Sequence, residues 1–317
     1  ARSALQITPR GQIEARLRVG LPASGRRVLG REAAALLLDD LPDLVEHALR
    51  ADTLDGDALR RHVHAVEDQQ ALRAQLAGRQ LVAFVADGAA LPRRSGVDPR
   101  PMQDGVVPFA APDRLAVTLD TPHSGAIRGL GISEGLSLIV GGGYHGKSTL
   151  LRALELGVYD QLPGDGRERV VTRADAVKVR AEDGRAVTAL DISSFIGVLP
   201  GGQATTSFTT ADASGSTSQA AAIVEARAVG SQLLLIDEDT SATNLLIRDA
   251  RMTALVTADK EPITPLIARI SGLRAAGCSL VLVVGGTGDY FGQADTVIWM
   301  DHWRAVDATA AARALAT

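Results

Sequence analysis

Four segments near the start of the chain have the hydrophobic periodicity of regular secondary structure. They predict a strand, two helices and a second strand, over residues 14–21, 31–50, 57–76 and 81–85. In the first strand every second residue is apolar, and in the helices apolar residues recur three or four positions apart. Pro42 is expected to break the first helix in two, because its ring does not fit a helix interior. The pattern predicts a small α/β segment over residues 1–87.

From residue 114 onward, strands, loops and helices alternate to the end of the chain. Apolar strands are predicted at residues 115–119, 136–140, 233–236 and 280–284. Two alternating runs, 176–181 and 185–190, flank an Asp-Gly turn and predict a β-hairpin. Strands that alternate with helices favour a mixed or mostly parallel sheet covered by helices. We therefore expect an α/β core over residues 114–317.

Residues 88–113 connect these two parts and differ from both in composition. They are crowded with proline and glycine, which is typical of a long loop or a connection between domains. Three arginines, Arg93, Arg94 and Arg100, lie in this segment. The plain interpretation is a solvated linker, and the alternative is that these arginines contact the phosphates of a nucleotide or of RNA.

A glycine-rich loop follows the strand predicted at 136–140. Gly141, Gly146, Lys147 and Ser148 fit the phosphate-loop pattern G-x-x-x-x-G-K-[ST]. Glycines allow successive backbone N–H groups to point at phosphate oxygens, and the helix that begins near Lys147 adds the positive end of its dipole. Lys147 would neutralise the β- and γ-phosphates, and Ser148 would offer its hydroxyl to Mg²⁺. The residues expected to surround the phosphates are Gly141, Gly142, Gly143, Tyr144, His145, Gly146, Lys147, Ser148 and Thr149.

Two carboxylates follow the apolar strand at 233–236. In a phosphate-loop sheet the end of such a strand lies beside the phosphates, so Asp237 would hold the Mg²⁺ water shell. Glu238 would polarise the attacking water. The plain alternative is that the two acids only cap the strand. No Asn-Lys-x-Asp motif for guanine is present, which disfavours a GTPase.

A further candidate for anion binding precedes a helix of small residues at 220–228. Ser214, Gly215 and Ser216 offer hydroxyl and backbone N–H groups at the start of that helix. Taken alone, such a sequence is also ordinary linker chemistry.

The composition narrows the classes of function. Of 317 residues, 46% are hydrophobic and 22% charged, and the net charge of −4 gives no general attraction for nucleic acid. Cys278 is the only cysteine, which fits a reducing compartment and predicts a cytoplasmic protein. No apolar run approaches the roughly 20 residues that span a bilayer, so no membrane-spanning segment is expected.

Several segments together resemble the predicted ATPases of the ABC class. The matching segments are 141–149, 165–167, 213–219, 236–244, 261–265 and 285–291. The resemblance runs from about Glu14 to the C-terminus and implies an ABC-type P-loop core that binds ATP and Mg²⁺. It also implies a homodimer, in which Ser214 and Gly215 of one subunit bind the γ-phosphate of ATP held by the other. Catalysis would then use Glu238 and Lys147, and the metal would be held by Ser148 and Asp237.

The resemblance leaves the process open. The family is similar to an ATPase associated with mitochondrial RNA editing in trypanosomes, which implies RNA as one possible partner. Family chains run longer at both ends, and this chain begins without Met, so we expect that flanking segments are missing. The alternative function is a nucleotide-gated RNA-binding module with little turnover.

The likeness to the ATPase domains of transporters is looser. Asn244 replaces the aspartate of their Thr-Ser-Ala-Leu-Asp loop, and Gly285 and Gly286 stand where they place a switch histidine. His145 or His302 could compensate for that histidine. These departures disfavour the ATPase subunit of a transporter.

Overall fold

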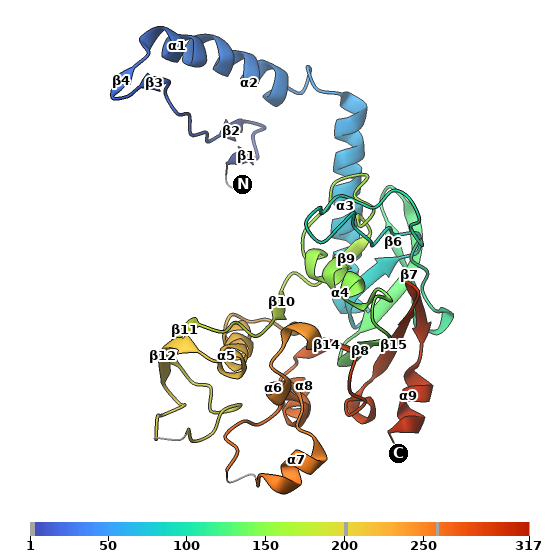
Figure 1. Cartoon of the computed structure of the whole chain (residues 1–317). Coiled ribbons are helices and arrows are strands. Elements are labelled where there is room, and N and C mark those ends of the chain that lie inside the picture. Colours follow the sequence, from blue (N-terminus) through green and yellow to red (C-terminus); the bar gives the residue numbers. More distant parts are fainter. Residues whose placement is uncertain (1–3, 200–201, 258–259, 317) are drawn as a thin grey trace. The chain divides into compact units, whose positions relative to one another are not determined.

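The structure is a computed structural model, and it describes residues 4–199, 202–257 and 260–316. These residues form two compact units, residues 1–63 and 64–317, which are considered separately (Figure 1). The division expected from the sequence, into 1–87, 88–113 and 114–317, stays a prediction. In the structure, strand β5 (Leu81–Ala86) pairs with β7 (Gly125–Ser133) and β9 (Val170–Thr172) of the second unit.

The first unit holds short strands and one helical stretch. Its elements are β1 (Leu5–Ile7), β2 (Ile13–Ala15), β3 (Ala23–Ser24), β4 (Arg27–Val28), α1 (Gly30–Ala35), the π-helical segment η1 (Leu36–Asp40) and α2 (Leu41–Leu49). The strand predicted at 14–21 is therefore wrong beyond Ala15. The helical backbone continues through Pro42, with the π-helical segment η1 directly before α2.

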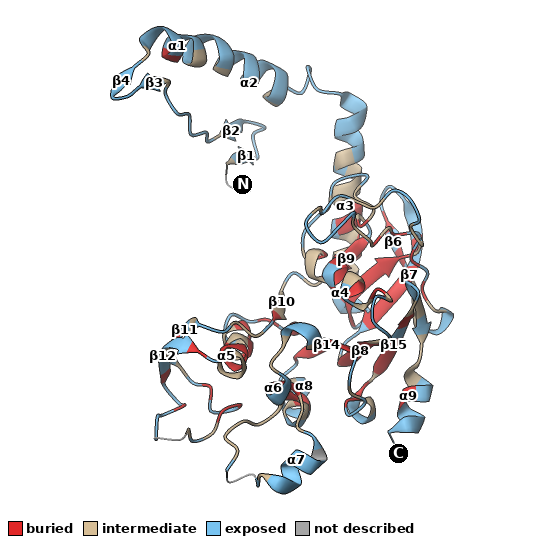
Figure 2. Cartoon of the chain, in the orientation of Figure 1, coloured by how far each residue is buried: buried red, intermediate tan, exposed pale blue. Residues whose placement is uncertain are grey.

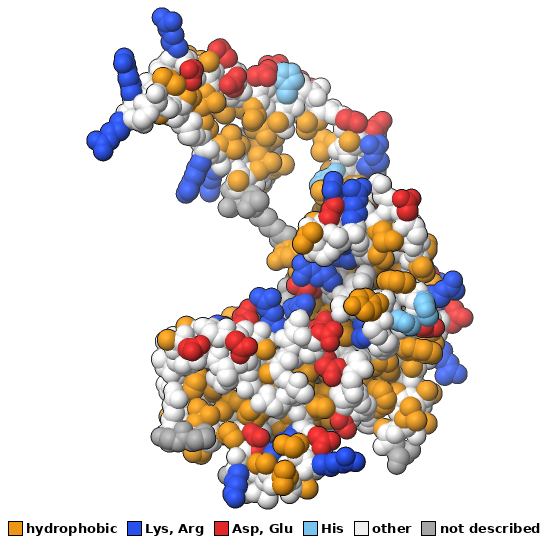
Figure 3. Space-filling model, viewed as in Figure 1, with side chains coloured by type: hydrophobic (Ala, Val, Ile, Leu, Met, Phe, Trp, Pro, Cys, Tyr) orange, Lys and Arg blue, Asp and Glu red, His pale blue; other side chains and the backbone are white. Residues whose placement is uncertain are grey.

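Most apolar side chains of this first unit are exposed. Among its described residues Ala33 alone is buried, whereas Leu37, Leu38, Leu44 and Val45 are exposed. Figure 2 shows the contrast with the buried central strands of the second unit, and Figure 3 shows hydrophobic side chains on the surface of the first unit. The amphipathic pattern that predicted the helix therefore has no core to face within this unit.

A six-stranded sheet organises the second unit. Its order is β10-β13-β14-β8-β15-β16, and all neighbouring pairs are parallel except β15 with β16. The strands are β8 (Leu136–Val140), β10 (Ala176–Val179), β13 (Leu233–Asp237), β14 (Ser279–Val284), β15 (Thr296–Asp301) and β16 (Arg304–Asp307). β13 and β14 are buried along their whole length, as expected for parallel strands covered on both faces. The predicted α/β class with a mixed, mostly parallel sheet is confirmed.

An antiparallel sheet packs over one side of this core. Its order is β6-β7-β5-β9, with β6 at Ala116–Thr121. Helix α4 (Lys147–Leu156) places Leu150 and Leu154 in one hydrophobic cluster with Val85 of β5 and Ile139 of β8. Helix α3 (Gly56–Gly78) contributes Leu72 and Leu76 to a second cluster, on the other face of β5.

The hairpin predicted around residues 182–184 is wrong. β10 pairs in parallel with β13, and β11 (Arg185–Leu190) pairs antiparallel with β12 (Phe208–Ala213) instead. The alternating pattern describes a strand with two unlike faces but does not name its partner. α5 (Gly215–Ala228) follows β12 directly. The remaining helices are α6 (Thr243–Leu246), α7 (Ala250–Leu255), α8 (Ile270–Ala275) and α9 (Thr309–Leu315), with short 3₁₀ turns at Asp113–Leu115, Glu238–Thr240, Leu266–Ala268 and Phe291–Gln293.

Within the described part of the chain, none of the helices combines the length and the apolar character that crossing a bilayer requires.

Candidate functional site

The order of the parallel strands brings the glycine-rich loop, Asp237 and Glu238 to the carboxyl ends of neighbouring strands. β8, β13, β14 and β15 run in the same direction, so the segments that follow them lie at the same end. These segments carry the glycine-rich loop, Asp237 with Glu238, Gly285 with Gly286, and Trp303. Clefts at the carboxyl ends of parallel strands are the usual ligand sites of open α/β sheets.

The glycine-rich loop has the backbone conformation of a tight cradle. Gly141 and Gly146 have φ angles of 141° and 97°, and Gly146 is the N-cap of α4. A methyl group on Gly141 would lie 2.3 Å from the backbone oxygen of Met300, so only glycine fits there. The ammonium of Lys147 bends back over the loop and donates to the carbonyl oxygens of Gly141 and Gly142, each at 2.8 Å.

A cavity of about 650 Å³ opens beside this loop, which is within the usual size range for small-molecule sites. Its lining is Gly143, Tyr144, Gly146, Lys147, Ser148, Thr149, Asp239 and Trp303. The cavity therefore includes most of the residues 141–149 that the sequence assigned to the phosphate loop. Tyr144 has a φ angle of 63° and its side chain is 97% exposed, so the loop presents it to solvent.

Glu238 is held by backbone groups at the end of β14. Its Oε2 accepts hydrogen bonds from the N–H groups of Gly285 at 2.5 Å and of Gly286 at 2.9 Å. A methyl group on Gly285 would lie 3.7 Å from Lys147 Nζ and 3.8 Å from Glu238 Oε2. The ammonium and the carboxylate therefore face the same small space. Asp237, at the end of β13, is 4% exposed, and its Oδ1 accepts from the N–H of Asp239 at 3.2 Å.

The Ser214 segment lies outside the cavity beside the glycine-rich loop. Ser214 is the N-cap of α5, its Oγ accepts from the N–H of Thr217, and it lies 3.4 Å from Ser216 Oγ. Ser214, Gly215 and Ser216 are absent from the described residues that line the cavity. A methyl group on Gly215 would lie 3.1 Å from Asp183 Oδ1, so a carboxylate already faces this helix end.

A chain of hydrogen bonds connects α5 with the end of β13. The buried amide of Gln219 donates to Ser241 Oγ at 2.8 Å and accepts from the N–H of Ala242 at 2.8 Å. Ser241 in turn donates to the carbonyl oxygen of Asp237 at 2.8 Å. A displacement of α5 would therefore act on the backbone of Asp237.

His145 and His302 meet on the other side of β8. His302 Nδ1 is 2.7 Å and His145 Nδ1 is 3.2 Å from the same oxygen of Asp301, and the two rings are 4.4 Å apart. His145 Nδ1 also accepts from the backbone N–H of His302 at 3.2 Å. In the sheet order this group belongs to β15, while Glu238 contacts the end of β14. The position of the absent switch histidine is thus filled by the glycine N–H groups that bind Glu238.

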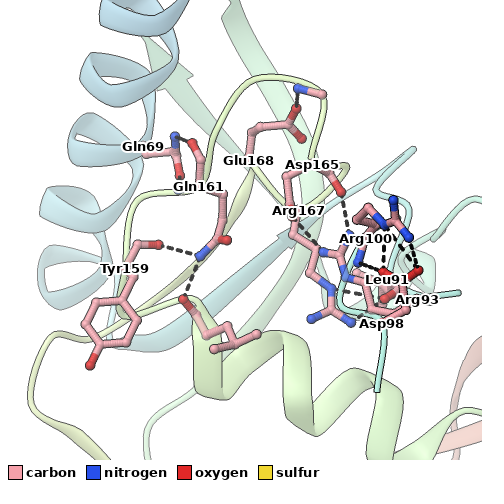
Figure 4. A network of polar contacts seen from close by, with 12 residues as sticks. Gln69, Leu91, Arg93, Asp98, Arg100, Tyr159, Gln161, Asp165, Arg167 and Glu168 are labelled. Atoms are coloured by element: carbon pink, nitrogen blue, oxygen red, sulfur yellow. Dashed lines mark hydrogen bonds and ion pairs between the residues drawn. The ribbon is translucent and has the colours of Figure 1, made fainter. Parts of the chain in front are cut away.

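The connecting segment 88–113 is packed within the second unit. Leu91 and Phe109 are buried and belong to the same cluster as β8 and α4. Arg93 donates to Asp165 Oδ1 at 2.6 Å, and the guanidinium of Arg167 donates to the carbonyl oxygen of Leu91 (Figure 4). Burial, together with the nearby Arg93, lowers the pKa of Arg167 to about 10.

The other two arginines of that segment differ in their surroundings. Arg100 pairs with Asp98 at 2.6 Å, and its hydrogen bond lowers the pKa of that carboxyl to about 2. Arg94 is exposed. Of the three arginines considered for phosphate binding, two are therefore occupied by carboxylates. The Asp165 and Asp98 partners follow from loop geometry, which the sequence did not reveal.

The site and the fold together define a P-loop protein: a glycine-rich loop leads from a buried strand into a helix, and acids end a neighbouring parallel strand. Residues 55–317 match the model of the P-loop domain of the ABC-class ATPases. Residues 1–52 match the model of the N-terminal region of ATPases of the ABC class. The chain belongs to this family.

Two known proteins are similar to the chain. The uncharacterized protein MJ1628 of Methanocaldococcus jannaschii is 32% identical over 200 residues, which are 60% of this chain and 44% of that protein. The chain therefore matches less than half of the length of this relative. A solved structure, CbiO1 from Clostridium perfringens, is part of the ABC transporter complex CbiONQ. It is 13% identical, with 71% of this chain and 87% of that chain covered and a TM-score of 0.38.

Proposed function

We propose that the chain binds ATP together with Mg²⁺ and hydrolyses it. The observation that carries this proposal is the convergence of Lys147 and Glu238 on the space beside Gly285, next to a cavity lined by the glycine-rich loop. An ammonium that now binds loop carbonyls can turn to a phosphate, and a carboxylate held by two N–H groups can orient a water. Membership of the ABC-class ATPases supports the same activity.

The residues present suit a magnesium ion. Mg²⁺ prefers oxygen ligands and keeps several of its waters, and when bound it neutralises charge that develops on the phosphates. Ser148 would offer a hydroxyl, and the buried carboxylate of Asp237 would hold the water shell. Lys147 would then stabilise the transferred phosphoryl group, while Glu238 orients the attacking water.

We also propose that two subunits bind ATP between them, head to tail. Ser214, Gly215 and Ser216 begin a helix of 14 residues but lie outside the cavity of their own subunit. A partner subunit could bring the same segment to the γ-phosphate, with the side chain of Asp183 turning away. The hydrogen bonds from Gln219 through Ser241 would then transmit a movement of α5 to the backbone of Asp237.

Coupling to RNA is the further part of the proposal. Arg94 is exposed, whereas Arg93 and Arg100 are paired with carboxylates, so a basic surface in segment 88–113 would be small. A hydrolase is therefore preferred over an RNA-binding module with little turnover.

Phosphate release by the wild type and by Glu238→Gln, with and without RNA, tests these points. The variant should lose about 100-fold or more of its turnover, the usual effect of removing a general base. It should still bind ATP and should form dimers in light scattering when ATP is added. Glu46→Gln, the same change on exposed α2, is the matched control. Unchanged turnover in Glu238→Gln would contradict the role of Glu238. A variant that stays monomeric with ATP would contradict the proposed dimer. Equal rates of phosphate release with and without RNA would contradict the coupling to RNA.

A further inference from the structure

Trp303 is an exposed aromatic side chain at the edge of the phosphate-loop cavity. It stands at the tip of the hairpin formed by β15 and β16, and its side chain is 41% exposed. A methyl group on Gly146 would lie 2.8 Å from the indole Cδ1, so the ring lies directly against the last glycine of the loop. With Tyr144 it is one of two aromatic residues in the lining of the cavity.

The backbone of this hairpin is strained in a way that fixes the indole. His302 and Trp303 form a two-residue turn with φ angles of 46° and 62°. Such turns normally contain Asn-Gly, because other residues meet steric resistance at positive φ. The N–H groups of His302 and Trp303 donate to Nδ1 and to the carbonyl oxygen of His145, at 3.2 Å and 3.1 Å. The turn is therefore tied to the phosphate loop itself, and Trp303 cannot move independently of it.

The packing behind the ring leaves it no freedom to fold away. Trp303 shares a gap of only about 10 Å³ with Leu91, Pro92 and Val107 of the connecting segment. Thr149, the residue after the phosphate-loop motif, lines both this gap and the main cavity. The indole is thus supported on one side and open on another.

The two sides of the cavity border different strands of the sheet. β14, with the glycines that bind Glu238, is on one side of β8, and β15, with Trp303, is on the other. A triphosphate in the loop with its terminal phosphate near Glu238 and Lys147 would extend its ribose and base toward the β15 side. Of the residues that line the cavity, Trp303 is the one that follows β15.

We propose that the base of a bound nucleoside triphosphate stacks on the indole of Trp303, which makes Trp303 the base platform of the site. This inference rests on the proposed function. A stacking platform tolerates different bases, because every base has a π-face. Purines offer the larger face, so they should bind better than pyrimidines while adenine and guanine differ little.

The test compares ligands with and without a base, using calorimetric titration of the full chain with Mg²⁺. Non-hydrolysable analogues of ATP, GTP and CTP supply the base, and inorganic tripolyphosphate supplies the phosphates alone. Trp303→Ala should bind the ATP and GTP analogues about tenfold more weakly, the size expected for loss of one stacked base. Its affinity for tripolyphosphate should stay within about twofold, since the loop remains.

Two further variants exclude a general effect on folding. Trp303→Phe keeps an aromatic face and should retain most of the affinity. Trp299→Ala removes an equally exposed indole from the same hairpin, outside the lining of the cavity, and should leave every affinity unchanged. The chain has two tryptophans, so Trp299→Phe leaves Trp303 as the single fluorophore. Its emission should be quenched by the ATP analogue and not by tripolyphosphate.

Three results would overturn the inference. Equal loss of tripolyphosphate and nucleotide affinity in Trp303→Ala would mean that the hairpin only supports the loop. Unchanged nucleotide affinity would mean that the base lies elsewhere, while the proposed ATPase function would stand. Failure of the wild type to bind either class of ligand would remove the proposed function and this inference together.

Discussion

Replacing Gly286 by alanine probes how closely the position of Glu238 is set. The added methyl group would lie 3.1 Å from Glu238 Oε1, which is tighter than an ordinary contact. The carboxylate must therefore shift by a few tenths of an ångström. The same shift stretches the hydrogen bond from the N–H of Gly286 to Oε2, now 2.9 Å long. If Glu238 orients the attacking water, turnover must fall.

The expected size follows from the displacement. A misplacement of about 1 Å in a reacting group can cost on the order of 100-fold in rate. A shift of about one third of that should cost roughly 3- to 10-fold in kcat. The KM for ATP should hardly change, because neither the glycine-rich loop nor Lys147 is touched by the new methyl group. Folding should not suffer, since Gly286 is outside the positive-φ glycines and a Gly→Ala change there restricts the unfolded chain.

Gly272→Ala, on helix α8, is the matched control. Its methyl group would meet no atom within 4 Å, and Gly272 is outside the lining of the cavity. Phosphate release should stay within about twofold of the wild type. The assay is steady-state phosphate release over a range of ATP concentrations, with urea unfolding of both variants. The reasoning is refuted if Gly272→Ala and Gly286→Ala lose the same turnover, or if neither variant loses any.

Three further changes test the packing around the site. Tyr290→Phe removes the 2.6 Å hydrogen bond from the buried hydroxyl to the carbonyl oxygen of Leu246, and it should cost about 1 kcal/mol in urea unfolding at pH 7. Burial raises the pKa of this hydroxyl above its ordinary 10.0, so the wild type loses stability once Tyr290 ionises in the unfolded chain. The stability difference between wild type and variant should therefore vanish about one pH unit above that value. A penalty that does not change with pH would contradict this burial effect. His302→Asn should raise the free energy of unfolding by roughly 0.5–1 kcal/mol, since asparagine tolerates positive φ, whereas His302→Ala should lower it; equal effects would argue against strain. Gly141→Ala, which brings a methyl group 2.3 Å from the oxygen of Met300, should abolish binding of tripolyphosphate in calorimetry, and retained affinity would show that the loop can shift freely.

The features that the sequence predicted well are those whose cause is local. The phosphate-loop motif specifies a strand, a turn rich in positive φ and a helix start within a few residues, and β8, the loop and α4 follow that order. The apolar run at 280–284 is short and rich in valine, which favours a buried strand, and β14 is buried throughout. The ABC-class family and the α/β fold are thereby confirmed, while the roles of individual site residues stay predictions.

The features that the sequence did not reveal depend on partners far along the chain. The alternation at 176–181 is equally compatible with a hairpin and with an edge strand, and only packing selects β13 as the partner of β10. Arg93 and Arg100 carry no sign of whether a carboxylate or a phosphate will face them. The turn at His302 and Trp303 lacks the Asn-Gly signal, so its sequence does not predict a two-residue hairpin turn.

The absence of Asn-Gly from this turn has an energetic consequence. A turn that places His and Trp at positive φ is less stable than one built with Asn-Gly, by about 1–2 kcal/mol for each such residue. The hydrogen bonds to His145 and the pairing with Asp301 offset part of this cost, and they also tie the turn to the glycine-rich loop. β8 lies between this turn and the glycines that bind Glu238, so the residues under strain are not those that hold the acid. The two sides of β8 can therefore be specialised independently, one for holding the base and the other for the chemistry at the terminal phosphate.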